Sequence, residues 1–239
     1  MKNLTVWPAW PAWRAAFTLA VAMVVVLAAG AGLSGCTSLL PKPVAAPTLY
    51  ALDATPAPAS TSSSVALARS SAIATLVVNT PRAAAGFDSQ HIMYVREPYK
   101  LEYFAHSEWV DTPARMLTPM LVATVAKSGA FKAVVPASIA ATGELTLDTE
   151  IVRLQQDFSV QPSRVVFSVR AYLLDAQTRK TIAWRELETV VVATEDNPLG
   201  GVVAANRAVQ MALQKVTDFC VKGAEQWQST RSAAMSLTQ

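Results

Sequence analysis

The stretch RVVFSVRAYLLDAQTRKTIAWRELETVVVAT, residues 164–194, decides the fold. Apolar side chains alternate with others over residues 164–175, and this period of two is typical of a β-strand with one buried face. The residues that share the apolar face are Val165, Phe167, Val169, Ala171 and Leu173. The residues AQTR then interrupt the pattern, and residues 180–194 resume a strand-like composition. The stretch therefore predicts a hairpin of two long strands.

Long elements flank this hairpin on both sides. Residues 144–158, ELTLDTEIVRLQQDF, predict a third long strand. Residues 199–228 predict an amphipathic helix, because apolar side chains recur every three or four positions. Its apolar stripe consists of Val202, Ala205, Val209, Leu213, Val216 and Cys220. We expect the last residues of the chain to fray.

A shorter helix is predicted upstream, over residues 112–129. Thr112 is a candidate N-cap, Pro113 suits the first helical position, and Gly129 suits the left-handed site that follows a helix. The apolar stripe of this helix consists of Leu117, Leu121 and Val125. Pro119 lies inside the pattern, and we expect a kink there because proline lacks the N–H that a helix interior requires.

Shorter strands complete the predicted fold. They are expected at residues 49–54, 74–81, 91–98, 100–110 and 131–135. Strands in hairpins together with two main helices predict an α+β fold in the order ββββα-ββββα, with the helices packed on an antiparallel or mixed sheet. We place this single domain at residues 49–228 and a flexible C-terminal tail at residues 229–239.

The N-terminus has a composition of its own. The opening MKNLTVWPAWPAWR is basic and free of acids, and residues 15–32 carry no charge. An uncharged run of this length suits either a membrane-spanning helix or the apolar part of a secretory signal. The small residues at its end, and the LSGC at residues 33–36, favour cleavage. We therefore predict a signal peptide at residues 1–35 and a mature chain that begins at Cys36.

The LSGC sequence resembles the lipobox of bacterial lipoproteins. The resemblance implies that the Cys36 sulfur receives a diacylglyceryl group and that the new amine is acylated, so that fatty acyl chains such as palmitate anchor the protein. Several chains are needed, since each buried methylene contributes about 0.8 kcal/mol. Residues 36–48, which contain three prolines, predict an extended tether. Thr37 follows the cysteine where Asp would signal retention, which by the same resemblance indicates the periplasmic side of the outer membrane rather than the inner membrane.

No motif of an enzyme, cofactor site or metal site stands out. The chain lacks the patterns G-x-S-x-G, H-E-x-x-H, G-x-G-x-x-G and the P-loop. His91 and His106 are predicted on paired strands, but two ligands make a weak zinc site, and we favour two polar residues on a sheet surface. Asp157 and Ser163 have no histidine near them in the sequence and are interpreted as loop residues. We expect no enzymatic activity, no cofactor and no metal.

The remaining polar and reactive residues also favour structural roles. Glu195 and Asp196 are interpreted as turn residues, or as the N-cap region of the last helix. Cys220 lies on the apolar stripe of that helix and is interpreted as a small buried hydrophobe, with an intermolecular disulfide as the alternative. The formal net charge is +3, and loss of Lys2 and Arg14 with the signal peptide reduces it to +1. So small a charge, without a basic cluster, excludes a typical nucleic-acid-binding surface.

Three segments together resemble one known family. They are YALD at residues 50–53, LEYFAHSEWVDTPARMLTPMLVATVAKSGAFKAVV at 101–135, and RVVFSVRAYLLDAQTRKTIA at 164–183. Their combination resembles the ABC-type transport auxiliary lipoproteins, which include the lipoprotein of the paraquat-inducible operon. The resemblance covers about residues 48–225 and rests on structural positions, not on a catalytic motif.

The resemblance implies a role in transport between the two membranes of an envelope. Lipoproteins of this family act with an MCE-domain (mammalian cell entry) protein, an ABC permease and an ATPase that move lipids, and the resemblance implies that this chain docks at the outer-membrane end. Cys36, as the lipidation site, is the functional residue that carries over. An envelope scaffold or regulator that binds a cell-wall or secretion complex is the alternative function. Whether the domain binds lipid itself or forms a homo-oligomer remains open.

Overall fold

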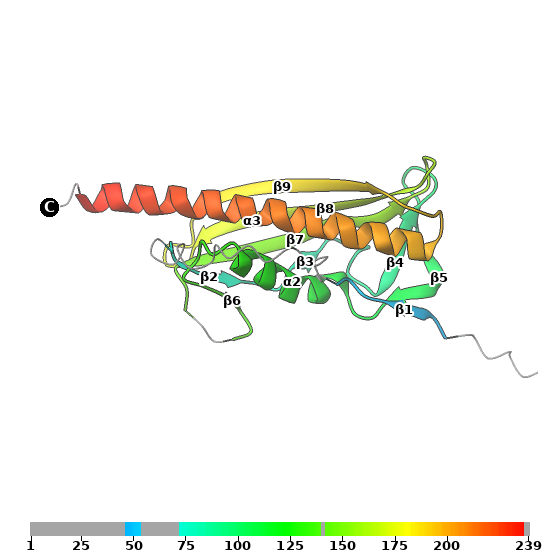
Figure 1. The fold of residues 1–239 in the computed structure, drawn as a ribbon, viewed down its shortest axis with the longest axis horizontal. Coiled ribbons are helices and arrows are strands. Elements are labelled where there is room, and N and C mark those ends of the chain that lie inside the picture. Colours follow the sequence, from blue (N-terminus) through cyan, green and yellow to red (C-terminus); the bar gives the residue numbers. More distant parts are fainter. Residues whose placement is uncertain (1–45, 54–71, 140–141, 237–239) are drawn as a thin grey trace, which may run out of the picture. The chain divides into compact units, whose positions relative to one another are not determined.

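The computed structural model describes residues 46–53, 72–139 and 142–236. The predicted signal peptide and Cys36 lie outside these residues. The elements along the chain are β1 Thr48–Tyr50, β2 Thr75–Val78, β3 Arg82–Ala83, β4 His91–Val95, β5 Leu101–Trp109, α2 Pro113–Lys127, β6 Ala133–Pro136, β7 Leu145–Asp157, β8 Arg164–Asp175, β9 Thr181–Val192 and α3 Pro198–Ser236 (Figure 1). One mixed sheet with two helices confirms the predicted α+β fold.

The long strand β7 organises the sheet. One of its edges pairs antiparallel with β8 from end to end, and β8 pairs in the same way with β9, as the sequence of the hairpin predicts. The other edge is shared by three shorter strands, because β2 pairs with the first residues of β7, β3 with the middle and β4 with the last, all parallel. Beyond these, β6 pairs with β2, while β5 and then β1 extend the sheet from β4.

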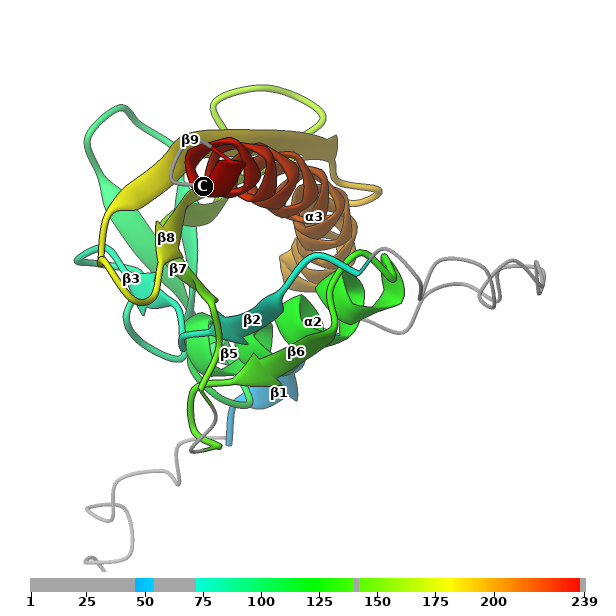
Figure 2. The ribbon, with the colours of Figure 1, turned by 90° about the vertical axis from the view of Figure 1, so that its left-hand side faces the viewer.

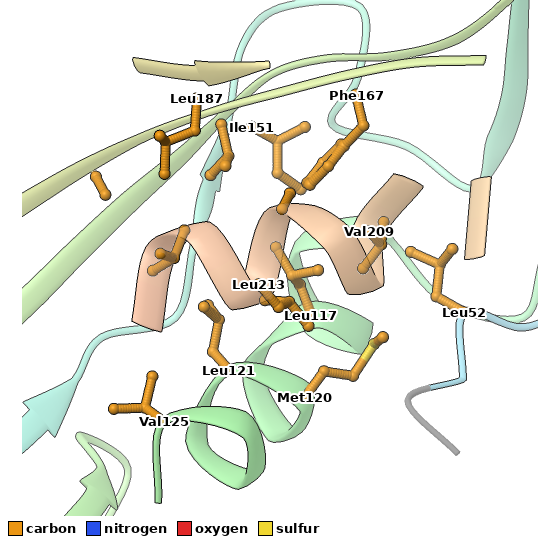
Figure 3. Packing of buried hydrophobic residues seen from close by; sticks show 14 of the residues in the cluster. Leu52, Leu117, Met120, Leu121, Val125, Ile151, Phe167, Leu187, Val209 and Leu213 are labelled. Carbon is orange, nitrogen blue, oxygen red and sulfur yellow. The ribbon is translucent and has the colours of Figure 1, made fainter. Parts of the chain in front are cut away.

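Both helices lie on one side of β7, β8 and β9 (Figure 2). In Figure 3, the α3 side chains Val209 and Leu213 lie between Leu117 and Leu121 of α2 and the side chains of the sheet. The apolar stripes predicted for the two helices and for β8 are all buried in one hydrophobic cluster. Complete burial of an aliphatic side chain contributes roughly 1.5–3 kcal/mol, so this cluster supplies the main stabilisation of the fold.

The ends of α2 follow the predicted signals in part. Pro113 occupies the first turn, and Gly129 adopts the left-handed conformation with φ of 69° just after the helix. Thr112 flanks the helix at the N-cap position, but its side chain makes no capping hydrogen bond. The helix continues through Pro119 to Lys127, and the kink expected at that proline stays a prediction.

The last helix is longer than the sequence predicted. Residues 229–236, expected to belong to a frayed tail, continue α3 to Ser236. No Gly or Pro interrupts these residues, so nothing in their local chemistry stops the helix. The Arg231 guanidinium also lies over the Trp227 ring, 5.2 Å from its centroid, and the Trp227 indole N–H donates to Asp175 Oδ2 at 2.8 Å. These contacts hold the helix where it leaves the sheet.

Candidate interaction surfaces

The described chain begins with a segment, residues 46–53, that we call the strap. Its strand β1 runs parallel to β5, with Thr48 opposite Ser107 and Tyr50 opposite Trp109. The Tyr50 carbonyl accepts a hydrogen bond from the Val110 N–H at 2.8 Å. The strap therefore extends the sheet beside the strand that leads into α2.

Beyond β1, the strap is held by both helices. The Leu52 side chain is 7% exposed and belongs to the core cluster, and its N–H lies 3.5 Å from Met116 Sδ of α2. The Asn206 side chain of α3 contacts the backbone on both sides of this leucine, since Oδ1 accepts from Asp53 N–H at 2.7 Å and Nδ2 donates to Ala51 O at 3.2 Å. The Asn206 side chain, in the third turn of α3, thus acts as a clamp on the strap, which lies over 150 positions earlier in the sequence.

A second surface is the face of β7, β8 and β9 that points away from α3, which we call the outer face. The side chains whose positions alternate with the core-facing ones form it: Glu150 on β7, Arg170 and Tyr172 on β8, and Trp184, Glu186 and Glu188 on β9. Ser168 of β8 lies on the same side but is buried. Trp184 is 61% exposed and stacks on Tyr172, with ring centroids 6.3 Å apart. Exposed aromatic rings of this kind are typical of protein-binding surfaces.

Charges adjoin this aromatic pair. Arg170 bridges two acids, with Nη1 3.1 Å from Glu150 and Nη2 2.8 Å from Glu186, and the hydrogen bond with Glu186 raises the pKa of the guanidinium, against a smaller effect of desolvation. The Ser168 hydroxyl donates to Glu188 at 2.9 Å. These pairs are partly exposed and screened by solvent, so they contribute little to stability. They order the carboxylates of β9, which pairs with β8 alone among the described strands.

The two histidines lie on the paired strands β4 and β5. His91 is opposite Glu108, 3.8 Å from Nδ1 to Oε1, and its ring stacks on Tyr103 at a centroid distance of 4.2 Å. His106 is exposed on β5 in a stretch where the pairing with β4 is irregular. Within the described ranges, no three His, Cys, Asp or Glu side chains gather closely enough to hold a metal ion.

The residues considered as catalytic candidates make hydrogen bonds within and between loops. These residues are Asp157, Ser163, Glu195 and Asp196. Desolvation opposes ionisation of Asp157, but hydrogen bonds from Ser159 and the pair with Arg164 outweigh it, and the pKa of Asp157 is lowered. Asp196 Oδ1 accepts from the Ser163 N–H at 2.8 Å, and the bond with Ser163 lowers the pKa of Asp196. Glu195 accepts a hydrogen bond from Asn197, whose own side-chain oxygen accepts from the Gly200 N–H at the start of α3. Turn and helix-cap roles therefore account for these residues.

Gln156 lies at the buried side of this loop cluster. Its Nε2 donates to Ser163 Oγ at 2.8 Å, while Oε1 has no partner and faces Gly201 so closely that a Cβ there would collide with it. The adjacent hollow, lined by Ile92, Trp109, Leu154, Val165 and Ala205 among others, measures about 10 Å³. This volume is at the lower limit for a single water molecule.

Cysteine chemistry is absent from the described part of the chain. Cys220 is completely buried on α3, as the sequence predicted, and burial raises the pKa of its thiol to about 12. A neutral thiol without access to solvent neither attacks nor pairs. Cys36 lies outside the described residues, so its lipidation stays a prediction.

Sequence reasoning missed Asn206 and the outer face. The signal for Asn206 was available, because Asn is disfavoured inside helices and its presence there indicates a specific hydrogen bond. The exposure of Trp184 had no sequence signal, since a tryptophan in a strand is more often buried.

No described helix is long and apolar enough to cross a membrane.

Comparisons with known proteins support a common fold. A family model described as the ABC-type transport auxiliary lipoprotein component matches residues 50–217. A crystal structure of a Xanthomonas campestris protein of the DUF330 family superposes with a TM-score of 0.62 at 21% identity, over 75% of this chain and 98% of that one. A crystal structure of an uncharacterized protein gives 0.55 at 13% identity, over 72% and 97% of the two chains. No curated protein matches the chain.

Proposed function

Since the chain belongs to the family of ABC-type transport auxiliary lipoprotein components, we propose that it is a lipid-anchored envelope protein that docks an MCE-type lipid transport system to the outer membrane. In this proposal, the signal peptide is removed and Cys36 carries the acyl chains. The observation that carries the proposal is the family match over residues 50–217, which runs from the second half of the strap to the middle of α3.

The packing of the domain supports docking rather than lipid carriage. The α3 side chains fill the layer between α2 and the sheet, and the hollow beside Gln156 is only about 10 Å³. An acyl chain needs a far larger cavity than one that accommodates a single water. In the proposed role, the described domain contributes a surface to its partners.

The outer face is the surface that we assign to the partner. It combines the exposed Trp184–Tyr172 pair with the carboxylates of Glu186 and Glu188. Aromatic side chains and desolvated charges are the usual anchors of protein interfaces. A basic or aromatic segment of the MCE-domain protein fits this combination.

Crosslinking in the envelope followed by purification tests the proposal. We expect the lipidated chain to recover an MCE-domain protein together with the permease and the ATPase. Recovery of a cell-wall synthase or a secretion component without any MCE-domain protein would reject it and favour an envelope scaffold. The Cys36→Ser variant is the control for the anchor, and its continued fractionation with the outer membrane in the absence of partners would contradict lipid anchoring.

A further inference from the structure

We propose that one end of the domain binds a phospholipid surface with anionic head groups. We call it the basic end, and it lies where β7 begins. It consists of the end of α2 and the loop that follows, the turn between β8 and β9, and the last part of α3. Figure 2 views the molecule onto this end, with the end of α3 toward the reader. The inference goes beyond the proposed function, since it involves neither Cys36 nor the outer face.

Hydrogen bonds, strand pairs and an ion pair bring these segments together. Leu145, the first residue of β7, is opposite Asp175, where the turn between β8 and β9 begins. The Asp175 carboxylate accepts a hydrogen bond from the Trp227 indole of α3 at 2.8 Å. Glu144, next to β7, lies 3.7 Å from Lys132 Nζ in the loop that follows α2. Segments from distant parts of the sequence therefore form one end of the molecule.

Basic side chains outnumber acidic ones at this end. Six are basic and three, Glu144, Asp175 and Glu225, are acidic, which gives a net charge of +3. The other described residues hold ten basic and fourteen acidic side chains, a net charge of −4. The six basic residues, all exposed, are Lys127, Lys132, Arg179, Lys180, Lys222 and Arg231. The sequence shows no basic cluster because the fold gathers these residues from separate elements.

This excess of positive charge does not depend on the residues outside the described ranges. All 17 Asp and Glu residues of the chain lie within those ranges. The side chains outside them therefore provide no carboxylate that could neutralise the basic end, wherever they lie.

Most of the basic side chains are available to an anion. Four of them form no ion pair with another described residue: Lys127, Arg179, Lys180 and Lys222. Two of the three acidic residues are instead engaged within the fold, since Glu144 accepts from the Thr75 N–H at 2.8 Å and Asp175 from the Thr178 N–H at 2.7 Å. An anionic surface can therefore approach these four cations without breaking an ion pair.

A lipid surface suits this arrangement because the charges are spread over the whole end. They belong to the ends of two helices and to a turn of the sheet. A membrane with anionic lipids presents its charge over a continuous surface, which such a spread of side chains can contact at several points. Trp227, whose ring lies 5.2 Å from the Arg231 guanidinium, adds an aromatic side chain of the kind that favours the head-group region.

Sedimentation with vesicles tests the basic end. The mature Cys36→Ser chain lacks the acyl anchor, so any binding comes from the protein itself. In about 0.1 M salt we expect it to sediment with vesicles of phosphatidylglycerol and phosphatidylethanolamine, and not with phosphatidylcholine vesicles. In about 1 M salt we expect this binding to be lost, because the Debye length falls from about 10 Å to about 3 Å. A chain that binds neither kind of vesicle, or both alike, would overturn the proposal.

Removal of charge from the turn between β8 and β9 locates the binding. Each Lys or Arg near an anionic membrane strengthens binding about fivefold. We therefore expect Arg179→Gln combined with Lys180→Gln to weaken binding to the anionic vesicles at least tenfold. Circular dichroism verifies that this variant is folded, and Lys222→Gln, with a loss of about fivefold, replaces it if it is not.

The matched control removes the same charge at the other end of β7. Arg96 and Lys100 are exposed in the turn between β4 and β5, and β4 pairs with the last residues of β7. We expect Arg96→Gln combined with Lys100→Gln to bind the vesicles like the parent chain. Equal weakening by the two pairs of substitutions would show that net charge alone matters, and would overturn the basic end as the site.

This inference and the proposed function fail in different ways. Vesicle binding by the Cys36→Ser chain needs no acyl anchor and no MCE-domain protein, so its absence leaves the proposed docking intact. A turn variant that binds vesicles like the parent chain but recovers less crosslinked partner would assign the basic end to an acidic protein surface, and would overturn lipid binding. Because high salt removes this binding but not an acyl anchor, the fractionation of Cys36→Ser that tests the anchor is made in about 1 M salt.

Discussion

Trp184 combines exposure with a fixed orientation. Its ring is 61% exposed and stacks on Tyr172, whose strand is held on both sides by β7 and β9. A rigid aromatic side chain loses little conformational entropy when a partner covers it, which is why such residues dominate binding free energies. Substitution of Trp184 therefore provides the most direct test of whether the outer face binds a partner.

Replacement of this ring should weaken partner binding without unfolding the protein. We expect Trp184→Ala to reduce the recovery of the crosslinked partner about tenfold, equivalent to about 1.4 kcal/mol, with a melting temperature close to that of the wild type. Tyr99→Ala is the matched control, because Tyr99 is a fully exposed aromatic residue in the turn between β4 and β5. Equal loss of partner in both variants would argue against the outer face as the docking surface.

Asp196 links stability to pH at the same scale. Its hydrogen bonds with Ser163 lower its folded-state pKa below the unfolded value, so its stabilising effect is present above the unfolded pKa and is lost as the pH falls through the folded pKa. We expect the urea midpoint of Asp196→Asn to lie below that of the wild type at pH 6, with a smaller difference at pH 3. A difference that grows as the pH falls would contradict the assignment.

At the scale of elements, α3 does most to unite the fold. Its buried face contacts β7, β8, β9 and α2, and its residue Asn206 holds the strap. Small residues permit this close approach, since a Cβ at Gly201 would collide with Gln156 and one at Gly223 with Leu173. The exposed last turns, from residue 228 to residue 236, take no part in this packing.

The two faces of this helix should differ in their sensitivity to truncation. We expect Leu213→Ala to reduce the free energy of unfolding by about 2–5 kcal/mol, because the side chain is 2% exposed and its removal leaves a cavity. Met211→Ala, two positions earlier and 50% exposed, should change it by less than about 0.5 kcal/mol. Urea unfolding followed by circular dichroism measures both, and similar losses would contradict the packing of α3.

Most elements were predictable from periodicity, and the failures have physical causes. The strands of 144–158, 164–175 and 180–194, the helix of 112–129 and the start of the last helix lie within a few residues of their predicted bounds, because each repeats its apolar pattern several times. The two-residue strand β3 is too short to carry a pattern. It exists because β7 offers a free edge, which is a property of the neighbouring strand.

At the scale of the whole molecule, a single core joins all the described elements. The buried cluster extends from Leu52 in the strap to Ala224 near the end of the packed part of α3. Because one continuous core joins both ends of β7 in the described part of the chain, we expect cooperative unfolding.

Urea unfolding of the mature chain should therefore show one transition. We expect circular dichroism and tryptophan fluorescence, in which the buried Trp109 takes part, to give the same midpoint, with a slope of about 2 kcal/mol per molar urea. Two separate transitions would indicate that the strands at the two ends of β7 form independent folding units.

The sequence by itself determined the order and kind of the longer elements, the buried faces of both helices and of β8, and the absence of a familiar catalytic motif. These properties are local, since a strand or helix repeats its pattern within a few residues. The tertiary structure alone decided that three short strands share one edge of β7, that Asn206 clamps a segment from the other end of the chain, and that Trp184 faces solvent. Each of these depends on which distant segments come into contact. The sequence around a residue does not indicate which distant residues it will contact.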